Sequence, residues 1–352
     1  MANASTIDGW RQAPRLTSFS AFFDRTAGGL DGMPDVAVPR PDLSMLDFDM
    51  ECAVFFDTQK ALWGAFDSHY FASIPFRLEE ECRLGAATLS FALNRWMSKS
   101  SPATLYTLGA GTGCLARTLG VLGGGRIKTL CCSPTAANQT AFNRRRGSEH
   151  AHFFLGPFFE LDDARYASDD ALEPFREGFD ILLEDTTFQM YGSDRVQQLD
   201  FIMPKIRDGG LLIQVQKLSH PDRDLYDARE RQKDDVFKPR YFSRANISGK
   251  KSEILDTMVD FQVDLEATTN ALRSFFRYSV ATWNSGNFYT IVSSNSRSSI
   301  LAFISLLKRP ALPPAYCYAE LPLVLVDTSS DPIGAVLHWR GDVGHASHRT
   351  AA

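Results

Sequence analysis

Residues 105–116 read Leu105-Tyr106-Thr107-Leu108-Gly109-Ala110-Gly111-Thr112-Gly113-Cys114-Leu115-Ala116, and this stretch decides the fold. An apolar run typical of a strand leads into three alternating glycines, and a helix-like segment follows at once. Glycine is favoured where the backbone turns sharply and a ligand approaches without a Cβ in the way. The spacing G-x-G-x-G differs from the dinucleotide pattern G-x-G-x-x-G and lacks the Lys-Ser/Thr of a P-loop. The turn therefore predicts close contact between the backbone and a flat, polar ligand that is not held by phosphates.

The composition is that of an ordinary globular protein. The chain has 352 residues, of which 44% are hydrophobic and 22% are charged, which fits one large domain with appendages or two domains. The net charge of −5 argues against nonspecific binding of nucleic acids or anionic membranes. No apolar run approaches the ~20 residues that a bilayer-spanning helix needs.

The cysteines indicate neither a metal site nor a disulfide framework. None of the six forms a C-x-x-C pair or lies at zinc spacing from a histidine, so no metal is expected. Adjacent Cys131 and Cys132 lie in an apolar run, where small buried side chains are the simpler interpretation. Reduced cysteines, and the lack of an apolar signal segment in residues 1–14, predict a cytoplasmic protein.

The N-terminal third is predicted to be an arm followed by a helical cap, residues 1–99. Residues 1–45 are rich in Pro, Gly and Asp, which favours a loose leader or an arm that docks late. From residue 48 to 97, apolar residues recur at three- and four-residue steps, the period of amphipathic helices. An aromatic break at residues 68–76 divides this helical cap.

From residue 104 onward, strand-like and helix-like segments alternate, which predicts an α/β fold with a parallel sheet. The expected strands are 104–108, 126–132, 152–155, 179–183 and 211–215, and the expected helices are 114–122, 135–145, 169–175 and 194–206. We expect Ser133-Pro134 to start the second of these helices, and Asp208-Gly209-Gly210 to stop the last. A charged helical insertion at 219–275 precedes a hairpin of 278–283 with 288–293, and a C-terminal extension covers 297–352.

These marks together resemble the class I S-adenosylmethionine (SAM)-dependent methyltransferases over about residues 100–296. The marks are the glycine turn, the Ser133-Pro134 helix start, the strand at 179–183 and the Asp208-Gly209-Gly210 stop. The insertion at 219–275 and the hairpin also look like those of bacterial small-molecule members. The resemblance implies a Rossmann-like seven-stranded, mostly parallel sheet with an antiparallel last strand, a helical N-terminal cap and a lid insertion.

Three positions depart from the family pattern. The family usually has an acid two residues before the first glycine, an acid at the end of strand two and an acid after strand three. Thr107, Cys131 and the turn Gly156-Pro157-Phe158 stand at those places. Each lost carboxylate removes a charge-assisted hydrogen bond of about 1.5–3 kcal/mol. Because of these departures, an alternative is a non-catalytic, methyltransferase-like binding protein.

The resemblance implies positions for the cofactor. The methionine part of SAM is expected on the glycine turn, Gly109, Ala110, Gly111, Thr112 and Gly113. The ribose is expected near Cys131, Cys132 and Ser133, and the adenine near Pro157 and Phe158. The sulfonium methyl group is expected to face the ends of strands four and five, beside Glu184 and Asp185.

Glu184 and Asp185 are the candidate catalytic residues. A carboxylate at this position can accept a proton from a hydroxyl or amine nucleophile, in line with the methyl group. Methyl transfer is a direct displacement, so positioning supplies much of the rate. The alternative is that one carboxylate caps the next helix and the other is solvated. Four aromatic residues and one glutamine are predicted to line the substrate pocket, although core packing explains them equally well: Tyr70, Phe71, Tyr191, Trp283 and Gln189.

The predicted acceptor is a small molecule that is methylated at oxygen or nitrogen. Asp185 with Lys217 resembles half of the Lys-Asp-Lys-Glu set of RNA 2′-O-methyltransferases, which is a second alternative. The acidic net charge and the lack of a convincing glutamate on the sixth strand disfavour that alternative. A proline-rich stretch at 310–314 and the tail after it suggest a homodimer.

Overall fold

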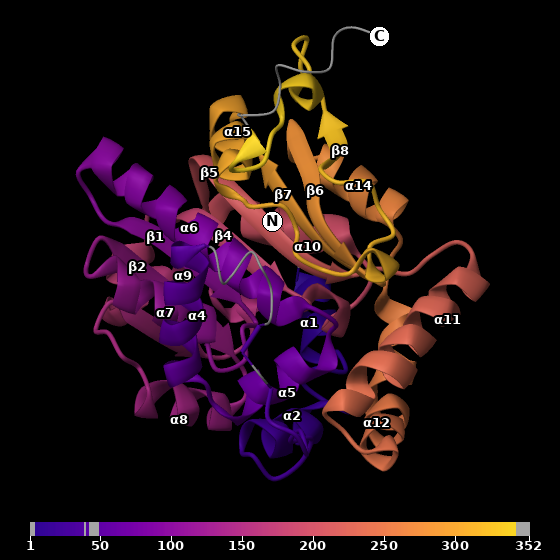
Figure 1. Cartoon of the computed structure of the whole chain (residues 1–352). Coiled ribbons are helices and arrows are strands. Elements are labelled where there is room, and N and C mark those ends of the chain that lie inside the picture. The colour runs from indigo at the N-terminus through magenta and orange to yellow at the C-terminus, as the bar shows by residue number, and fades with distance from the viewer. Residues whose placement is uncertain (1–3, 39, 42–48, 343–352) are drawn as a thin grey trace, which may run out of the picture.

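The computed structural model describes residues 4–38, 40–41 and 49–342, and its centre is one mixed β-sheet (Figure 1). The strand order is β3-β2-β1-β4-β5-β7-β6-β8. β1 to β5 pair in parallel, and β7 runs antiparallel to both β5 and β6. The strands are β1 Ala103–Leu108, β2 Ile127–Ser133, β3 Ala151–Leu155, β4 Phe179–Asp185, β5 Ile206–Lys217, β6 Tyr278–Ser285, β7 Phe288–Ser294 and β8 Leu323–Asp327. The predicted α/β class, the parallel sheet and the antiparallel seventh strand are therefore confirmed.

Helices cover both faces of the sheet, because successive strand residues point to opposite sides. Leu105 belongs to one apolar core and its neighbour Tyr106 to the other. The helices before the lid are α1 Ala4–Arg11, α2 Ser20–Ala27, α4 Met50–Leu62, α5 Ala65–Ser73, α6 Arg77–Lys99, α7 Cys114–Gly123, α8 Ala136–Arg144, α9 Asp163–Ser168 and α10 Arg195–Ile202. Short 3-10 turns are η1 Phe158–Glu160, η2 Asp170–Phe175, η3 Phe188–Met190 and η4 Met203–Lys205.

The lid insertion connects β5 to β6 and is helical, as its charged periodicity predicts. Its elements are α11 Arg223–Gln232, η5 Lys233–Phe237, η6 Lys238–Arg240, α12 Arg244–Lys250, η7 Lys251–Leu255, α13 Asp256–Met258, η8 Val259–Phe261 and α14 Leu265–Arg273. α14 returns to the sheet and packs on α10. α11 and α12 extend away from the sheet, on the side of the molecule that carries α2 and α5 (Figure 1). The lid thus brings charged helices to the N-terminal arm and cap.

In the part of the chain that the structure describes, the sheet has eight strands, whereas the sequence predicts seven. β8 comes from the C-terminal extension and pairs antiparallel with β6, with Tyr278 opposite Asp327. Without β8, β6 would be an edge strand with a row of unpaired backbone groups. The apolar run Leu323–Asp327 forms β8 and pairs with these groups. α15 Arg297–Leu306 from the same extension packs on α6, where the rings of Phe91 and Phe303 lie 5.7 Å apart.

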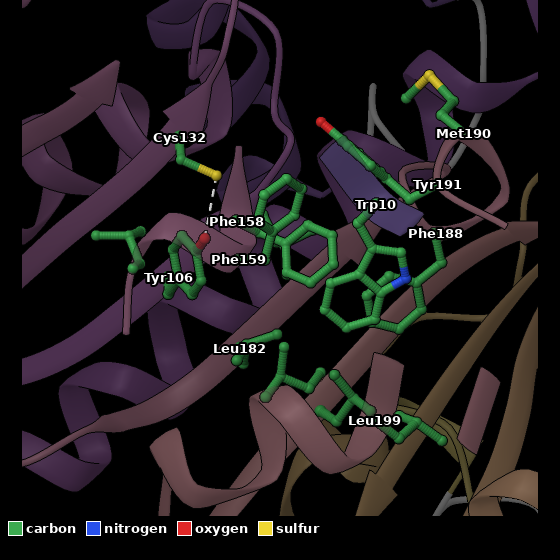
Figure 2. Close-up of a cluster of buried hydrophobic side chains, with 14 of the residues drawn as sticks. Trp10, Tyr106, Cys132, Phe158, Phe159, Leu182, Phe188, Met190, Tyr191 and Leu199 are labelled. Carbon is green, nitrogen blue, oxygen red and sulfur yellow. Dashed lines mark hydrogen bonds between the residues drawn. The ribbon is translucent and has the colours of Figure 1, made fainter. Parts of the chain in front are cut away.

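Of the two predictions for residues 1–45, a loose leader or a docked arm, the described residues form the docked arm. α1 and α2 pack on the domain, and Trp10, Phe19 and Phe22 are buried. The ring of Trp10 lies 5.2 Å from that of Phe158 and 5.7 Å from that of Phe159 (Figure 2). Burial of such aromatic side chains outweighs the helix-breaking composition around them.

Two boundary predictions are also wrong. Ser133 is the last residue of β2 and does not cap α8, which begins at Ala136; its Oγ accepts from the amide of Thr135 at 3.3 Å. Gly209 and Gly210 do not stop a helix but lie inside β5. Gly209 has φ +68°, and the register between β4 and β5 shifts there, so the glycines form a bulge and the strand continues. Within the described residues, no helix is long and apolar enough to cross a membrane.

Candidate active site

A cavity of about 150 Å³ lies where the parallel strands end. Its wall includes the glycine turn after β1, Ser133 at the end of β2, Asp185 at the end of β4 and Lys217 at the end of β5. β1 and β4 flank the point where the strand order reverses, which is where ligands bind in open α/β sheets. The arm, the cap helix α5 and the lid close the cavity from outside.

The glycine turn lies tightly against its neighbours. Gly109 has φ +67° and Gly111 φ +54°, conformations that favour glycine. A Cβ on Gly109 would lie 2.0 Å from Oγ1 of Thr187, and a Cβ on Gly111 would lie 2.5 Å from the ring of Phe66. Gly109, Ala110 and Gly111 line the cavity. The ring of Phe66 therefore covers the turn directly.

Thr112 and Gly113, the second half of the turn, contact other parts of the protein and do not line the cavity. Thr112 donates through Oγ1 to Oδ2 of Asp67 at 2.6 Å, and Arg117 donates to Thr112 at 2.9 Å. Gly113 packs on Sγ of Cys131. Burial raises the pKa of Asp67 against the opposing charge of Arg117. Asp67 faces the cavity from α5, and its position 45 residues before Thr112 left no signal in the sequence.

At the end of β2, only Ser133 of the three predicted ribose residues reaches the cavity. Cys132 makes a hydrogen bond through Sγ with the hydroxyl of Tyr106 at 3.0 Å (Figure 2). Burial raises the pKa of Cys132 to about 11 and that of Cys131 well above its ordinary value, so both remain thiols. Asn138 on α8, which the sequence did not single out, donates to Oγ of Ser133 at 3.0 Å and lines the cavity.

After β3, the predicted adenine residues Pro157 and Phe158 do not line the cavity. The ring of Phe158 is buried in an aromatic cluster with Trp10, Phe188 and Tyr191 (Figure 2). Arg15 of the arm lines the cavity instead. The arm therefore encloses these aromatic rings, which keeps Pro157 and Phe158 away from the cavity wall.

Arg15 is a buried cation. Its Nη2 donates to Oγ1 of Thr135 at 2.8 Å, and its guanidinium lies 4.2 Å from the ring centre of Phe23. Burial lowers the pKa of Arg15, against weaker opposing interactions that include Asp24. The arm thus contributes a charge and two phenylalanines, Phe22 and Phe23, to the cavity.

The adjacent carboxylates Glu184 and Asp185 have opposite surroundings. Glu184 is fully buried and accepts from the amides of Thr187 at 2.6 Å and Phe188 at 2.9 Å, and from the side chain of Gln216. Burial raises the pKa of Glu184 to about 7. Glu184 caps the turn η3 behind the wall of the cavity, whereas Asp185 faces the cavity.

Asp185 is bound by two residues of the cap. Arg77 donates to its Oδ2 at 2.8 Å, and the hydroxyl of Tyr70 donates to Oδ1. Arg77 is fully buried and also pairs with Glu81 at 2.7 Å. Burial opposes the charge of Arg77, but Asp185 and Glu81 outweigh it and raise the pKa of Arg77 well above its ordinary value. Burial and Asp185 raise the pKa of Tyr70, which therefore remains a neutral donor.

Three buried acceptor atoms on the cavity wall have no hydrogen-bond partner within the described part of the chain. They are Oγ1 of Thr107, Oδ1 of Asn138 and Oε1 of Gln189. Leaving a buried polar atom unpaired costs about 1–3 kcal/mol, so such atoms are rare unless something else satisfies them. The three atoms are free to accept hydrogen bonds from a ligand in the cavity.

The predicted substrate residues divide into two groups. Tyr70, Phe71 and Gln189 line the cavity. Tyr191 is buried in the aromatic cluster of Figure 2, and Trp283 packs with Ile74 and Phe288. Among the residues that the structure describes, no three His, Cys, Asp or Glu side chains gather to hold a metal ion.

No family model and no curated protein matches the sequence. Solved structures of low sequence identity match the chain. They include an O-methyltransferase family protein from Burkholderia thailandensis, with 14% identity over 62% of this chain and 60% of that chain and a TM-score of 0.37. The plantazolicin methyltransferase BpumL in complex with SAH has 9% identity over 83% and 94% of the two chains and a TM-score of 0.42. Human N-acetylserotonin methyltransferase in complex with SAM has 16% identity over 83% and 65% and a TM-score of 0.37.

Proposed function

We propose that this protein is a SAM-dependent methyltransferase that methylates an oxygen or nitrogen atom of a small molecule. One observation carries the proposal. The cavity at the switch point of the sheet presents a glycine turn with unpaired acceptors on one side and the carboxylate of Asp185 beside them. Unpaired acceptors suit the hydroxyl and ammonium donors of SAM, and a carboxylate suits the nucleophile of a methyl acceptor.

The residues of the cavity fit this cofactor in their chemistry. Asn138 and Ser133 would bind the ribose hydroxyls, and Thr107 and Gln189 would accept from other donors of SAM. The backbone of the glycine turn would contact the methionine part of SAM. Arg15 lines the cavity, whereas Phe158 does not. When bound, SAM supplies an electrophilic methyl group on a sulfonium sulfur.

The cavity is smaller than ordinary ligand sites, which run from about 300 to 1,000 Å³. Its volume of about 150 Å³ is reduced by the ring of Phe66, which lies on Gly111. Phe66 is one face of an aromatic wall that includes Tyr70, whose ring stacks on it at 6.2 Å. The ring of Phe66 therefore lies against the part of the glycine turn that the cofactor would contact.

Asp185 is the proposed catalytic residue. Its side chain is 15% exposed, and Arg77 and Tyr70 fix its two oxygens. The carboxylate would accept the proton of an O–H or N–H group and orient the lone pair of the nucleophile. His69 does not take this role, because Gly32 and Lys250 contact its two ring nitrogens. Glu184 is proposed as a structural residue, since it faces away from the cavity.

Two features of the structure disfavour the alternative of an RNA 2′-O-methyltransferase. Lys217 lines the cavity with Asp185, but it pairs with Glu230 of the lid at 2.9 Å. The strand β6 carries no glutamate. The remaining alternative is a methyltransferase-like protein without catalysis, which a titration distinguishes from an enzyme.

The proposal is tested by calorimetric titration with SAM and S-adenosylhomocysteine (SAH), using two matched glycine variants. Gly111→Val places a side chain against Phe66 and the cofactor, whereas Gly286→Val has a similar φ of +60° with nothing within 4 Å of its Cβ. We expect micromolar binding of SAH to the wild type and to Gly286→Val, and none to Gly111→Val. Absence of binding to the wild type would overturn the cofactor proposal and favour the non-catalytic alternative.

A further inference from the structure

Four lysines gather on the lid side of the same cavity. Lys217 ends β5, Lys233 begins the π-helix η5, Lys238 begins the 3-10 helix η6, and Lys250 ends α12. All four line the cavity. Lys217, Lys233 and Lys238 are each no more than 5% exposed, which is unusual for lysine.

Within the described residues, two carboxylates form ion pairs with these four ammonium groups. Glu230 pairs with Lys217 at 2.9 Å and also with Lys233, and Asp234 pairs with Lys238 at 2.7 Å. Burial would raise the pKa of Glu230, but Lys217 and Lys233 outweigh it and hold that pKa well below its ordinary value. Both carboxylates are therefore already used within the cluster.

Lys250 has no carboxylate partner among the residues that the structure describes. Its Nζ lies 2.5 Å from Nε2 of His69 and 3.0 Å from Oγ of Ser73. The carbonyl of Gly32 contacts Nδ1 of His69 and can only accept, so Nδ1 carries the proton and Nε2 accepts from Lys250. Burial and the nearby charge of Lys250 lower the pKa of His69 well below its ordinary value, which keeps the ring neutral.

The cluster thus has an excess of positive charge in a buried place, which is costly without an anion. Burial and repulsion from Lys233 lower the pKa of Lys238 to about 8. Burial and repulsion from Lys238 and Lys233 lower the pKa of Lys250 well below its ordinary value. A bound anion would relieve this repulsion and favour the charged form of each lysine.

Apolar side chains complete the wall around the lysines. Phe22 and Phe66 line it from the arm and cap, and Ile254, Leu255 and Met258 line it from the lid. An apolar wall with a few charged groups suits a ligand that has an apolar body and one anionic end.

We propose that the methyl acceptor is a small organic anion, a carboxylate or a phosphate ester, whose charged group binds Lys217, Lys233, Lys238 and Lys250. Its apolar body lies against the phenylalanines of the arm and cap. The ligand's role as methyl acceptor rests on the proposed function. The existence of an anion site is argued from the four lysines and does not depend on that function. The methionine part of SAM is proposed to lie on the glycine turn, which leaves the lid lysines for a second molecule.

The test is calorimetric titration with three probes of similar size: benzoate, phenyl phosphate and the neutral benzyl alcohol. Each is titrated into the free protein and into protein saturated with SAH. We expect the better of the two anions to bind at least tenfold more tightly than benzyl alcohol. The anion that binds more tightly identifies the charged group of the acceptor as a carboxylate or a phosphate.

Three lysine variants locate the site. Lys238→Gln and Lys250→Gln remove one charge each, and Lys251→Gln is the control, because Lys251 is the exposed neighbour of Lys250. We expect a loss of anion affinity of tenfold or more for the first two, a change below twofold for the control, and SAH affinity unchanged within twofold in all three. Lys250→Gln breaks no ion pair and should keep the melting temperature, whereas Lys238→Gln also removes the partner of Asp234, so circular dichroism checks that both variants fold.

Two results would overturn the proposal. Anions that bind no better than benzyl alcohol, or equal losses in Lys251→Gln and Lys250→Gln, would exclude an anion site at the lid. Loss of SAH affinity in Lys238→Gln and Lys250→Gln would instead assign the lysines to the cofactor. A protein that binds the anions but not SAH would keep the anion site and reject the proposed methyltransferase, so the two failures are distinguishable.

Discussion

The two sides of the cavity differ in charge and in how their polar groups are satisfied. On the glycine-turn side, Thr107, Asn138 and Gln189 present neutral acceptors without partners in the described chain. On the lid side, the lysines present donors and excess positive charge around Glu230 and Asp234. One side needs a ligand rich in donors, and the other needs an anion. The proposed cofactor and the proposed anionic acceptor would each satisfy one of the two sides.

Asp185 lies between these sides and is engaged by the cap rather than by either of them. Arg77 and Tyr70, which hold its oxygens, come from α6 and α5. Glu184, one residue earlier in the same strand, is sealed behind the wall. Because Glu184 belongs to neither side of the cavity, we expect its substitution to change stability and to leave ligand binding unchanged.

The largest expected effect concerns the pH dependence of stability at Glu184. Burial raises its folded pKa to about 7, so the native protein keeps a proton that the unfolded chain releases near its ordinary pKa. The stabilisation is full below the unfolded pKa and is lost as pH rises through the folded pKa. We expect Glu184→Gln to gain about 3 kcal/mol in unfolding free energy relative to the wild type between pH 4.5 and pH 7.

Urea denaturation at several pH values measures this difference. The wild type alone is not sufficient, because burial also raises the pKa of Glu79 to about 7. Only the difference between Glu184→Gln and the wild type isolates one carboxyl group. A difference that stays constant from pH 4.5 to pH 7 would show that Glu184 is ionised in the fold, and SAH affinity that falls tenfold in the variant would return Glu184 to the site.

The next effect concerns Asp185 and its ion pair. Breaking a buried ion pair costs about 3–5 kcal/mol, and Glu81 remains as a partner of Arg77, so we expect Asp185→Asn to lose about 2 kcal/mol of unfolding free energy near pH 7. Tyr70→Phe removes only a neutral donor and should lose about 1 kcal/mol. Benzoate should bind more tightly to Asp185→Asn, since one negative charge has left the cavity. Equal losses in both variants would show that the charge of Asp185 contributes nothing.

Much of the sheet was predictable because its signals are local. Periodicity of apolar residues predicts β1 to β7, and the glycine turn predicts the sharp connection to α7. The carboxyl ends of parallel strands meet at one edge, so the sequence also brings Gly109 and Asp185 to one place. The bulge at Gly209 was missed because a glycine pair after a helix is equally typical of a stop.

The rest of the site depends on contacts between distant residues. Arg77 lies 108 residues before Asp185, and His69 lies 181 residues before Lys250. A lysine in the charged lid is indistinguishable in sequence from a solvated one, and only burial in the fold separates Lys238 from Lys251. The docking site of the arm depends on the same kind of contact, because Trp10 packs against the rings of Phe158 and Phe159, which lie about 150 residues later in the chain.

The smallest expected effect is on SAH affinity, and it concerns Asn138 on the glycine-turn side of the cavity. Its Nδ2 donates to Ser133, and its Oδ1 is buried without a partner in the residues described, so Asn138→Ala removes one acceptor. We expect the Kd for SAH to rise about tenfold, which corresponds to about 1.4 kcal/mol.

Asn138→Asp is the opposite test, because it returns a carboxylate to the region where the sequence lacks one. A charge-assisted hydrogen bond is about twice as strong as a neutral one, so the aspartate should bind SAH more tightly than alanine and at least as tightly as asparagine. Benzoate affinity should change less than twofold in Asn138→Ala, since the lysines lie on the other side. If Asn138→Ala weakened benzoate as much as SAH, the two ligands would share one site, and the difference between the two sides would have no functional meaning.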